Sequence, residues 1–102
     1  MRESYPVVWC ERSGPVAAGS LLLGPTALRL DGVAGGAHAT RELRYSELAG
    51  VRMAAYGEER LGGRPTLLIE PAGAPALQVA SVAGLGVLRE VADVLARTMS
   101  GD

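Results

Sequence analysis

The stretch that decides the fold of this 102-residue chain is GSLLLGPTALRLDG, residues 19–32. It begins with an apolar run that ends in three successive leucines. Residues 24–25, Gly-Pro, then break the strand, because proline donates no backbone hydrogen bond and presets a turn. In the run that follows, Leu28 and Leu30 share one face and Arg29 lies on the other, which is the period of a half-buried strand. The stretch therefore predicts a β-hairpin.

Strand-like segments continue on both sides of this hairpin. The Gly- and Ala-rich segment 31–39 is expected to be a loop, and the charged, glycine-containing segment 56–65 is expected to be a mobile one. Residues 71–75, PAGAP, form a turn between two apolar runs, which predicts a second antiparallel hairpin. In all, we expect strands at residues 5–11, 16–23, 27–30, 40–45, 48–55, 66–70 and 76–80.

The period of the apolar residues changes after Ser81. Apolar residues then recur three and four positions apart up to Met99, while charged residues such as Arg89 and Asp93 occupy the other face. This pattern predicts an amphipathic helix over about residues 83–99, whose wide apolar face must dock on the sheet. We therefore expect one domain, residues 1–102, with a mainly β (α+β) fold: six to seven antiparallel strands, covered by one C-terminal helix.

Composition excludes several classes of function. Ten arginines against eleven acidic residues give a net charge of −1, which argues against the uncompensated phosphate contacts of a nucleic-acid-binding protein. With one cysteine, Cys10, and one histidine, His38, the chain has no internal disulfide and too few ligands for a structural zinc site. We expect no metal and no cofactor.

Membrane insertion and secretion are not indicated either. No apolar run approaches the roughly 18 residues that a membrane-spanning helix needs. Glu3, Pro6 and Glu11 interrupt the N-terminal segment, where a secretory signal would require a continuous apolar region. The expected compartment is therefore the cytoplasm.

Two stretches carry a resemblance to a known family. Residues 19–32 resemble the opening hairpin of pleckstrin-homology-like (PH-like) and GRAM-like domains, and RELRYSELAGV, residues 41–51, is similar to their third strand and its link into the fourth. On these motifs the chain is identified as a divergent, bacterial-type member of the PH-like family. The resemblance implies a bent seven-stranded partial barrel with one open end plugged by the final helix, and a scaffold that binds proteins, peptides or lipids.

The chain departs from the family where PH-like domains bind phosphoinositides. Those domains use a first hairpin loop rich in lysine and arginine, because adjacent phosphates need several convergent cations. Here the hairpin offers residues 24–26, Gly-Pro-Thr, and one nearby cation, Arg29. No phosphoinositide site is therefore carried over to these positions.

Three arginines form the first candidate binding set, since each faces away from the apolar side of its strand: Arg29, Arg44 and Arg52. Together they could line one surface and hold a carboxylate, a phosphate or an acidic peptide through their forked donors. The other interpretation, which the near-zero net charge favours, is that they pair across strands with nearby carboxylates. The candidate partners are Glu42, Glu47 and Glu70.

The charged segment 56–65 is the second candidate, as an interaction loop. It is longer than a simple turn requires, and loops on a rigid scaffold commonly carry function. Its two adjacent glutamates have arginines beside them, so a solvated, self-compensating loop is favoured over an acid–base pair. The residues singled out are Tyr56, Glu58, Glu59, Arg60 and Arg64.

No residue is assigned a catalytic role. A nucleophilic pair of Cys10 and His38 would need direct contact, an orienting group and an oxyanion site, and nothing in the sequence points to that pairing. We expect instead an exposed loop histidine and a half-buried cysteine. Trp9 is expected to fill the core of a chain that lacks phenylalanine.

The function predicted from the sequence is a non-catalytic cytoplasmic module that binds a protein or peptide partner, with a second copy of the chain among the candidates. The alternative is binding of an anion or a lipid headgroup at a membrane surface through the arginine set. An enzymatic function would require a site shared between subunits.

Overall fold

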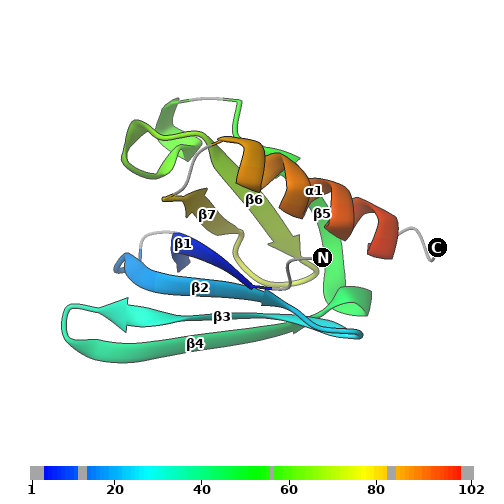
Figure 1. Ribbon diagram of the computed structural model, residues 1–102, viewed down its shortest axis with the longest axis horizontal. Coiled ribbons are helices and arrows are strands. Elements are labelled where there is room, and N and C mark those ends of the chain that lie inside the picture. Colours follow the sequence, from blue (N-terminus) through cyan, green and yellow to red (C-terminus); the bar gives the residue numbers. More distant parts are fainter. Residues whose placement is uncertain (1–3, 12–13, 56, 83–84, 100–102) are drawn as a thin grey trace.

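The computed structural model describes residues 4–11, 14–55, 57–82 and 85–99 (Figure 1). In this part of the chain, seven strands precede one α-helix. The strands are β1 (Ser4–Glu11), β2 (Ala17–Leu23), β3 (Ala27–Ala34), β4 (Ala37–Arg44), β5 (Leu48–Met53), β6 (Thr66–Pro71) and β7 (Leu77–Ser81). Three short 3₁₀ turns, η1 (Tyr45–Glu47), η2 (Gly57–Glu59) and η3 (Leu61–Gly63), and the helix α1 (Leu85–Met99) complete the set.

All seven strands belong to one antiparallel sheet, in the order β4-β3-β2-β1-β7-β6-β5. β1 is the bridging strand, because it pairs with β2 on one side and with β7 on the other. The sheet curls into a half-barrel, and α1 lies across β5, β6 and β7 (Figure 1). The expected fold class is confirmed: a mainly β partial barrel with one C-terminal helix. The expected hairpin of β6 and β7 is also confirmed.

The main core lies between the inner face of the sheet and the helix. From α1, Leu88, Val91 and Leu95 are each at most 1% exposed, as the apolar stripe predicts. From β1, Trp9 is 3% exposed, which confirms it as a core residue. Its indole N–H donates to the backbone oxygen of Asp31 at 3.1 Å, so this large side chain is buried without losing its hydrogen bond.

A second, smaller buried layer lies on the outer face of the sheet. Cys10, Thr66, Leu68 and Ala80 are each at most 4% exposed, although they alternate along their strands with core residues and so point to the opposite side. The chain between β5 and β6 folds back beside β7 and helps to cover this layer (Figure 1). β6 is therefore buried on both faces, which explains its continuous apolar run.

The structure contradicts the loop predicted at residues 31–39. β3 continues to Ala34 and β4 begins at Ala37, so only two residues separate them. These are Gly35 and Gly36, with φ angles of 58° and 85°, and such positive values suit the tight turn of a two-residue hairpin. Low strand propensity is overridden here because both strands are held by their neighbours in the sheet.

Other boundaries shift by a few residues. β5 ends at Met53 instead of residue 55, and Tyr45 belongs to η1 rather than to a strand. The Tyr45 hydroxyl donates to the backbone oxygen of Gly24 at 2.7 Å, which anchors the start of this turn beside the β2–β3 connection. Burial raises the pKa of this phenol above its ordinary value. Within the described residues, no helix combines the length and apolar character needed to cross a membrane.

The opposition of Gly19 and Gly32 in the β2–β3 ladder generates the first prediction. A β-carbon at Gly19 would lie 2.0 Å from the backbone oxygen of Asp31, whereas one at Gly86 in α1 would meet nothing within 4 Å. We expect Gly19→Ala to lower the free energy of unfolding by about 1–3 kcal/mol through overpacking. The control Gly86→Ala should raise it by about 0.4–1 kcal/mol. Urea unfolding measures both, and an unchanged midpoint for Gly19→Ala would contradict this strand register.

Candidate functional site

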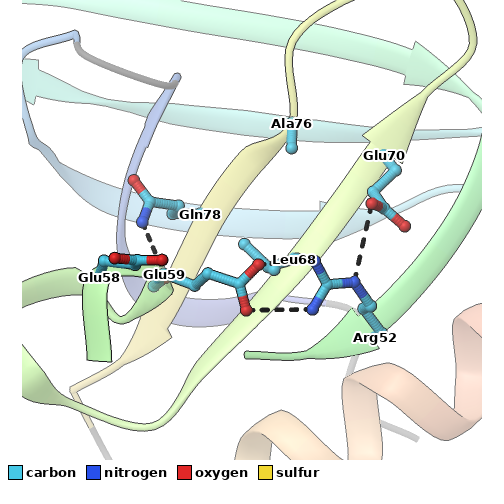
Figure 2. A pocket seen from close by; sticks show the side chains of 7 residues that line it. All are labelled: Arg52, Glu58, Glu59, Leu68, Glu70, Ala76 and Gln78. Atoms are coloured by element: carbon cyan, nitrogen blue, oxygen red, sulfur yellow. Dashed lines mark hydrogen bonds and ion pairs between the residues drawn. The ribbon is translucent and has the colours of Figure 1, made fainter. Parts of the chain in front are cut away.

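An open, charged cleft lies on the outer face of the sheet, where the chain between β5 and β6 meets β6 and β7 (Figure 2). Its volume is about 620 Å³. One arginine and three glutamates dominate its lining, so the cleft carries an excess of negative charge. The lining residues are Arg52, Glu58, Glu59, Leu68, Glu70, Ala76 and Gln78.

Arg52 lies in this cleft between two carboxylates. Its Nη1 and Nη2 atoms donate to Oε1 and Oε2 of Glu59 at 3.2 and 2.7 Å, which is the bidentate geometry of a strong guanidinium–carboxylate pair. On its other side, Nε lies 3.7 Å from Oε2 of Glu70 (Figure 2). The guanidinium is therefore engaged by the protein's own carboxylates.

Glu59 is the central residue of the cleft, because it is held through its backbone as well as its side chain. Its Oε1 also accepts a hydrogen bond from the backbone N–H of Ala55 at 3.1 Å. Its backbone oxygen accepts a bond from Nε2 of Gln78 at 2.8 Å. The Sγ of Cys10 donates to Oε1 of the same glutamine at 3.2 Å. One chain of contacts thus ties β1 and β7 to the 3₁₀ turn η2 and onward to β5 and β6.

The predicted mobile loop contains local structure and several anchors. Besides η2, it forms η3, in which Gly62 and Gly63 adopt φ angles of 63° and 74°. The Thr66 hydroxyl accepts a hydrogen bond from the backbone N–H of Leu61 and donates one to the backbone oxygen of Arg64, both at 2.8 Å. These bonds hold the second half of the segment to the start of β6. The segment predicted as a charged, mobile loop thus contains two 3₁₀ turns and is bonded to the start of β6.

The residues of the predicted interaction loop have different environments. Glu58, Arg60 and Arg64 are exposed, whereas Glu59 is half-buried and engaged as described above. Tyr56 lies outside the described residues. The segment thus presents three exposed charges on a connection whose backbone is tied to the sheet.

The structure does not bring the three predicted arginines to one surface. Arg29 on β3 and Arg44 on β4 lie on neighbouring strands, but Arg52 is on β5 at the opposite edge of the sheet. Arg29 donates through Nε to Asp31 at 3.1 Å. The guanidinium groups of Arg29 and Arg52 are thus engaged by carboxylates, as the pairing interpretation expects. Of their partners, it named Glu70 but not Asp31 or Glu59.

Cys10 and His38 are also separated. Cys10 lies on β1 and His38 on β4, with β2 and β3 between them. The cysteine is 4% exposed rather than half-buried, and burial raises the pKa of its thiol. His38 is exposed as expected, but on a strand instead of a loop. Among the described residues, no group of three or more histidines, cysteines and carboxylates could hold a metal ion.

Gln78 and Thr66 are the site residues that sequence reasoning missed. Gln78 is the single polar residue between Leu77 and Ala80, and strand periodicity places it on the face opposite to the core. The available signal was this one polar side chain within the otherwise apolar run of residues 76–80. Its partner is the backbone of Glu59, 19 positions away, and no local pattern indicates such a contact.

The two edge strands of the sheet differ in regularity. β5 pairs with β6 through a register shift between Leu48 and Gly50, and such an irregularity protects an edge against further pairing. β4 pairs with β3 without interruption from Ala27 opposite Arg44 to Ala34 opposite Ala37. It contains no proline, and its charged side chains are Arg41, Glu42 and Arg44. In Figure 1 it forms the rim of the sheet.

The direction of the backbone groups on β4 follows from its hairpin. The two-residue turn makes Ala34 and Ala37 a hydrogen-bonded pair, and such pairs alternate along an antiparallel ladder. The same alternation reaches Tyr45, which is also odd-numbered: its N–H donates a hydrogen bond to the backbone oxygen of Thr26 at 3.0 Å. The odd-numbered residues of β4 therefore bond to β3, and the even-numbered ones direct their N–H and C=O groups outward.

One of these outward groups is already used within the chain. The N–H of Arg44 donates to Oε1 of Glu47 at 3.0 Å. His38, Thr40 and Glu42 therefore form the open edge of β4. Their side chains share the outer face and are exposed.

No family model, no curated protein and no solved structure matches this chain.

The contacts of Gln78 generate a prediction about Cys10. In the native protein the thiol should react more slowly with a disulfide reagent than a free cysteine does, with its rate profile moved to higher pH, because burial disfavours the reactive thiolate. Gln78→Ala removes the bonds to Cys10 and to Glu59. We expect it to accelerate labelling several-fold and to cost about 1 kcal/mol of stability. The control Gln78→Glu keeps the acceptor to Cys10 and should react more slowly than Gln78→Ala; equal rates for all three proteins would contradict this role of Gln78.

Proposed function

We propose that the chain is a non-catalytic interaction module, which binds an extended segment of a protein or peptide partner along the open edge of β4. The observation that carries this proposal is the set of outward backbone groups at His38, Thr40 and Glu42, on a regular eight-residue strand at the end of the sheet. An added strand gains affinity from main-chain hydrogen bonds and specificity from side chains on alternate positions.

The rest of the molecule supports this function as a scaffold. α1 and the core hold the sheet on its inner face, and the contacts of Glu59 tie down the connection on its outer face. Seven antiparallel strands followed by one helix also suit the PH-like layout, so we propose a divergent member of that family. The free, buried thiol of Cys10 suits a reducing compartment such as the cytoplasm.

Anion binding by the arginine set has less support. Two of its three members are engaged by carboxylates of the chain, and Arg52 is at the opposite edge of the sheet from Arg44. A phosphate or carboxylate ligand would have to displace these internal partners, and these three arginines do not converge on one point to compensate.

Substitution of Thr40 tests the proposal. Proline at this position removes an N–H that faces away from β3, so the β3–β4 pairing should persist while an added strand loses its central bond. Peptides selected on the wild-type protein from a displayed random library should bind Thr40→Pro about tenfold more weakly. Thr40→Val, which keeps the N–H, should bind them as the wild type does.

Hydrogen exchange locates the same contact. Bound peptide should slow exchange of the amides of His38, Thr40 and Glu42, relative to the free protein. Equal peptide affinity for Thr40→Pro and wild type, or protection that excludes β4, would contradict the proposal.

A further inference from the structure

The sequence of β4 is complementary to itself about Thr40. His38 precedes this residue by two positions, and Glu42 follows it by two. In an antiparallel pair of two β4 strands centred on Thr40, His38 of one copy faces Glu42 of the other, and the second such pair is related by the two-fold axis.

We infer that β4 pairs with β4 of a second copy in this register, so that two half-barrels share one continuous sheet. The inference rests on the proposed function, because it names the segment that the open edge of β4 binds: the same strand of another molecule. It adds the partner and the register to that function.

The backbone of β4 permits this register. In an antiparallel pair, residues that face each other exchange both backbone hydrogen bonds at every second position. Pairing about Thr40 places His38, Thr40 and Glu42 opposite even-numbered residues of the second copy. These are the positions whose N–H and C=O groups point outward, so the free groups of both strands meet.

The side chains on the outer face complement one another in the same register. The imidazole of His38 carries an N–H in either protonation state, which can donate to the Glu42 carboxylate of the second copy. Val33, which is 51% exposed, lies opposite His38 in the β3–β4 ladder, and Arg29 lies opposite Glu42. Across the joined sheet, one row therefore reads Val33 and His38, followed by Glu42 and Arg29 of the second copy.

The centre of the interface is also compatible with pairing. The Thr40 hydroxyl donates to Oδ1 of Asp31 at 3.0 Å, which holds its side chain toward its own β3. The threonines of the two copies can then face each other without an unpaired hydroxyl donor. Cross-strand threonine pairs are favourable in antiparallel sheets.

Neighbouring registers lack this complementarity. Centring on Glu42 would place two glutamates in direct opposition, and centring on Arg41 would oppose two arginines and set His38 against Arg44. The N–H of Arg44 is already bonded to Glu47, which further disfavours registers shifted toward that end. Charge therefore disfavours the registers shifted toward Arg44, and among the registers that the backbone allows, the one centred on Thr40 sets His38 against Glu42.

A charge exchange between two variants tests this register. Sedimentation equilibrium of the wild type should show a monomer–dimer equilibrium. His38→Glu alone opposes two carboxylates at each of the symmetric contacts. Glu42→Arg alone removes the acceptor that faces His38 and sets two hydrogen-bond donors against each other, so each variant should dimerise about tenfold more weakly. An equimolar mixture should form a heterodimer about as tightly as the wild type. There, one contact joins the introduced carboxylate to the introduced guanidinium, and the other keeps His38 against Glu42.

The matched control places the same charge change elsewhere. Glu58 is exposed in η2 on another part of the surface. A heterodimer of His38→Glu with Glu58→Arg keeps one contact of opposed carboxylates, so it should form more weakly than the wild-type dimer. Thermal unfolding by circular dichroism confirms that each variant remains folded.

Preferential heterodimer formation would support the register. A mixture no more dimeric than its separate components, or a wild type that stays monomeric at every concentration reached, would overturn the inference. If the wild type stays monomeric but selected peptides bind it and not Thr40→Pro, the proposed function is supported and only the dimer is contradicted. If neither peptide binding nor self-association is found, both proposals are contradicted.

Discussion

The pairing of β1 with β7 is the interaction on which the rest of the structure depends. Its register runs from Val7 opposite Ser81 to Glu11 opposite Leu77, and it joins the β1–β4 meander to the β5–β7 meander. Because β1 also pairs with β2, the first strand lies inside the sheet instead of at an edge. The alternation along β1 then begins two buried layers: Trp9 enters the main core, and Cys10 enters the outer layer.

The outer layer determines what the charged groups of this protein can do. The ion pair of Arg52 and Glu59 is partly exposed, so it adds little to stability. Its effect is geometric, because it acts with Gln78 to hold η2 against the sheet and leaves Arg52 engaged. The charged segment predicted as a mobile loop is thus tied to the sheet through Glu59. We therefore proposed binding at the edge of β4, whose backbone hydrogen-bonding groups point outward.

The sheet does not close into a barrel, so it has two edge strands, and the two differ in the regularity of their pairing. β5 carries an irregular register, whereas β4 is regular along its length. A regular edge is a template for another strand unless something blocks it. The parity of the β3–β4 hairpin decides which backbone groups would meet that strand, and in the proposed dimer His38 and Glu42 would decide which strand is complementary. The proposed peptide binding and the proposed self-association would therefore both use the open edge of β4.

Local pattern by itself determined the elements whose signal is periodic: the strand of Leu28 and Leu30, the hairpin of β6 and β7, and the helix that buries Leu88, Val91 and Leu95. It failed at residues 31–39, because glycine and alanine have weak strand propensity. Pairing with β2 and with each other makes β3 and β4 strands there. The pairing of Arg52 with Glu59, the partner of Gln78 and the open edge of β4 were decided by the tertiary structure alone. Each depends on which strands lie side by side, and that follows from long-range pairing, which no local pattern records.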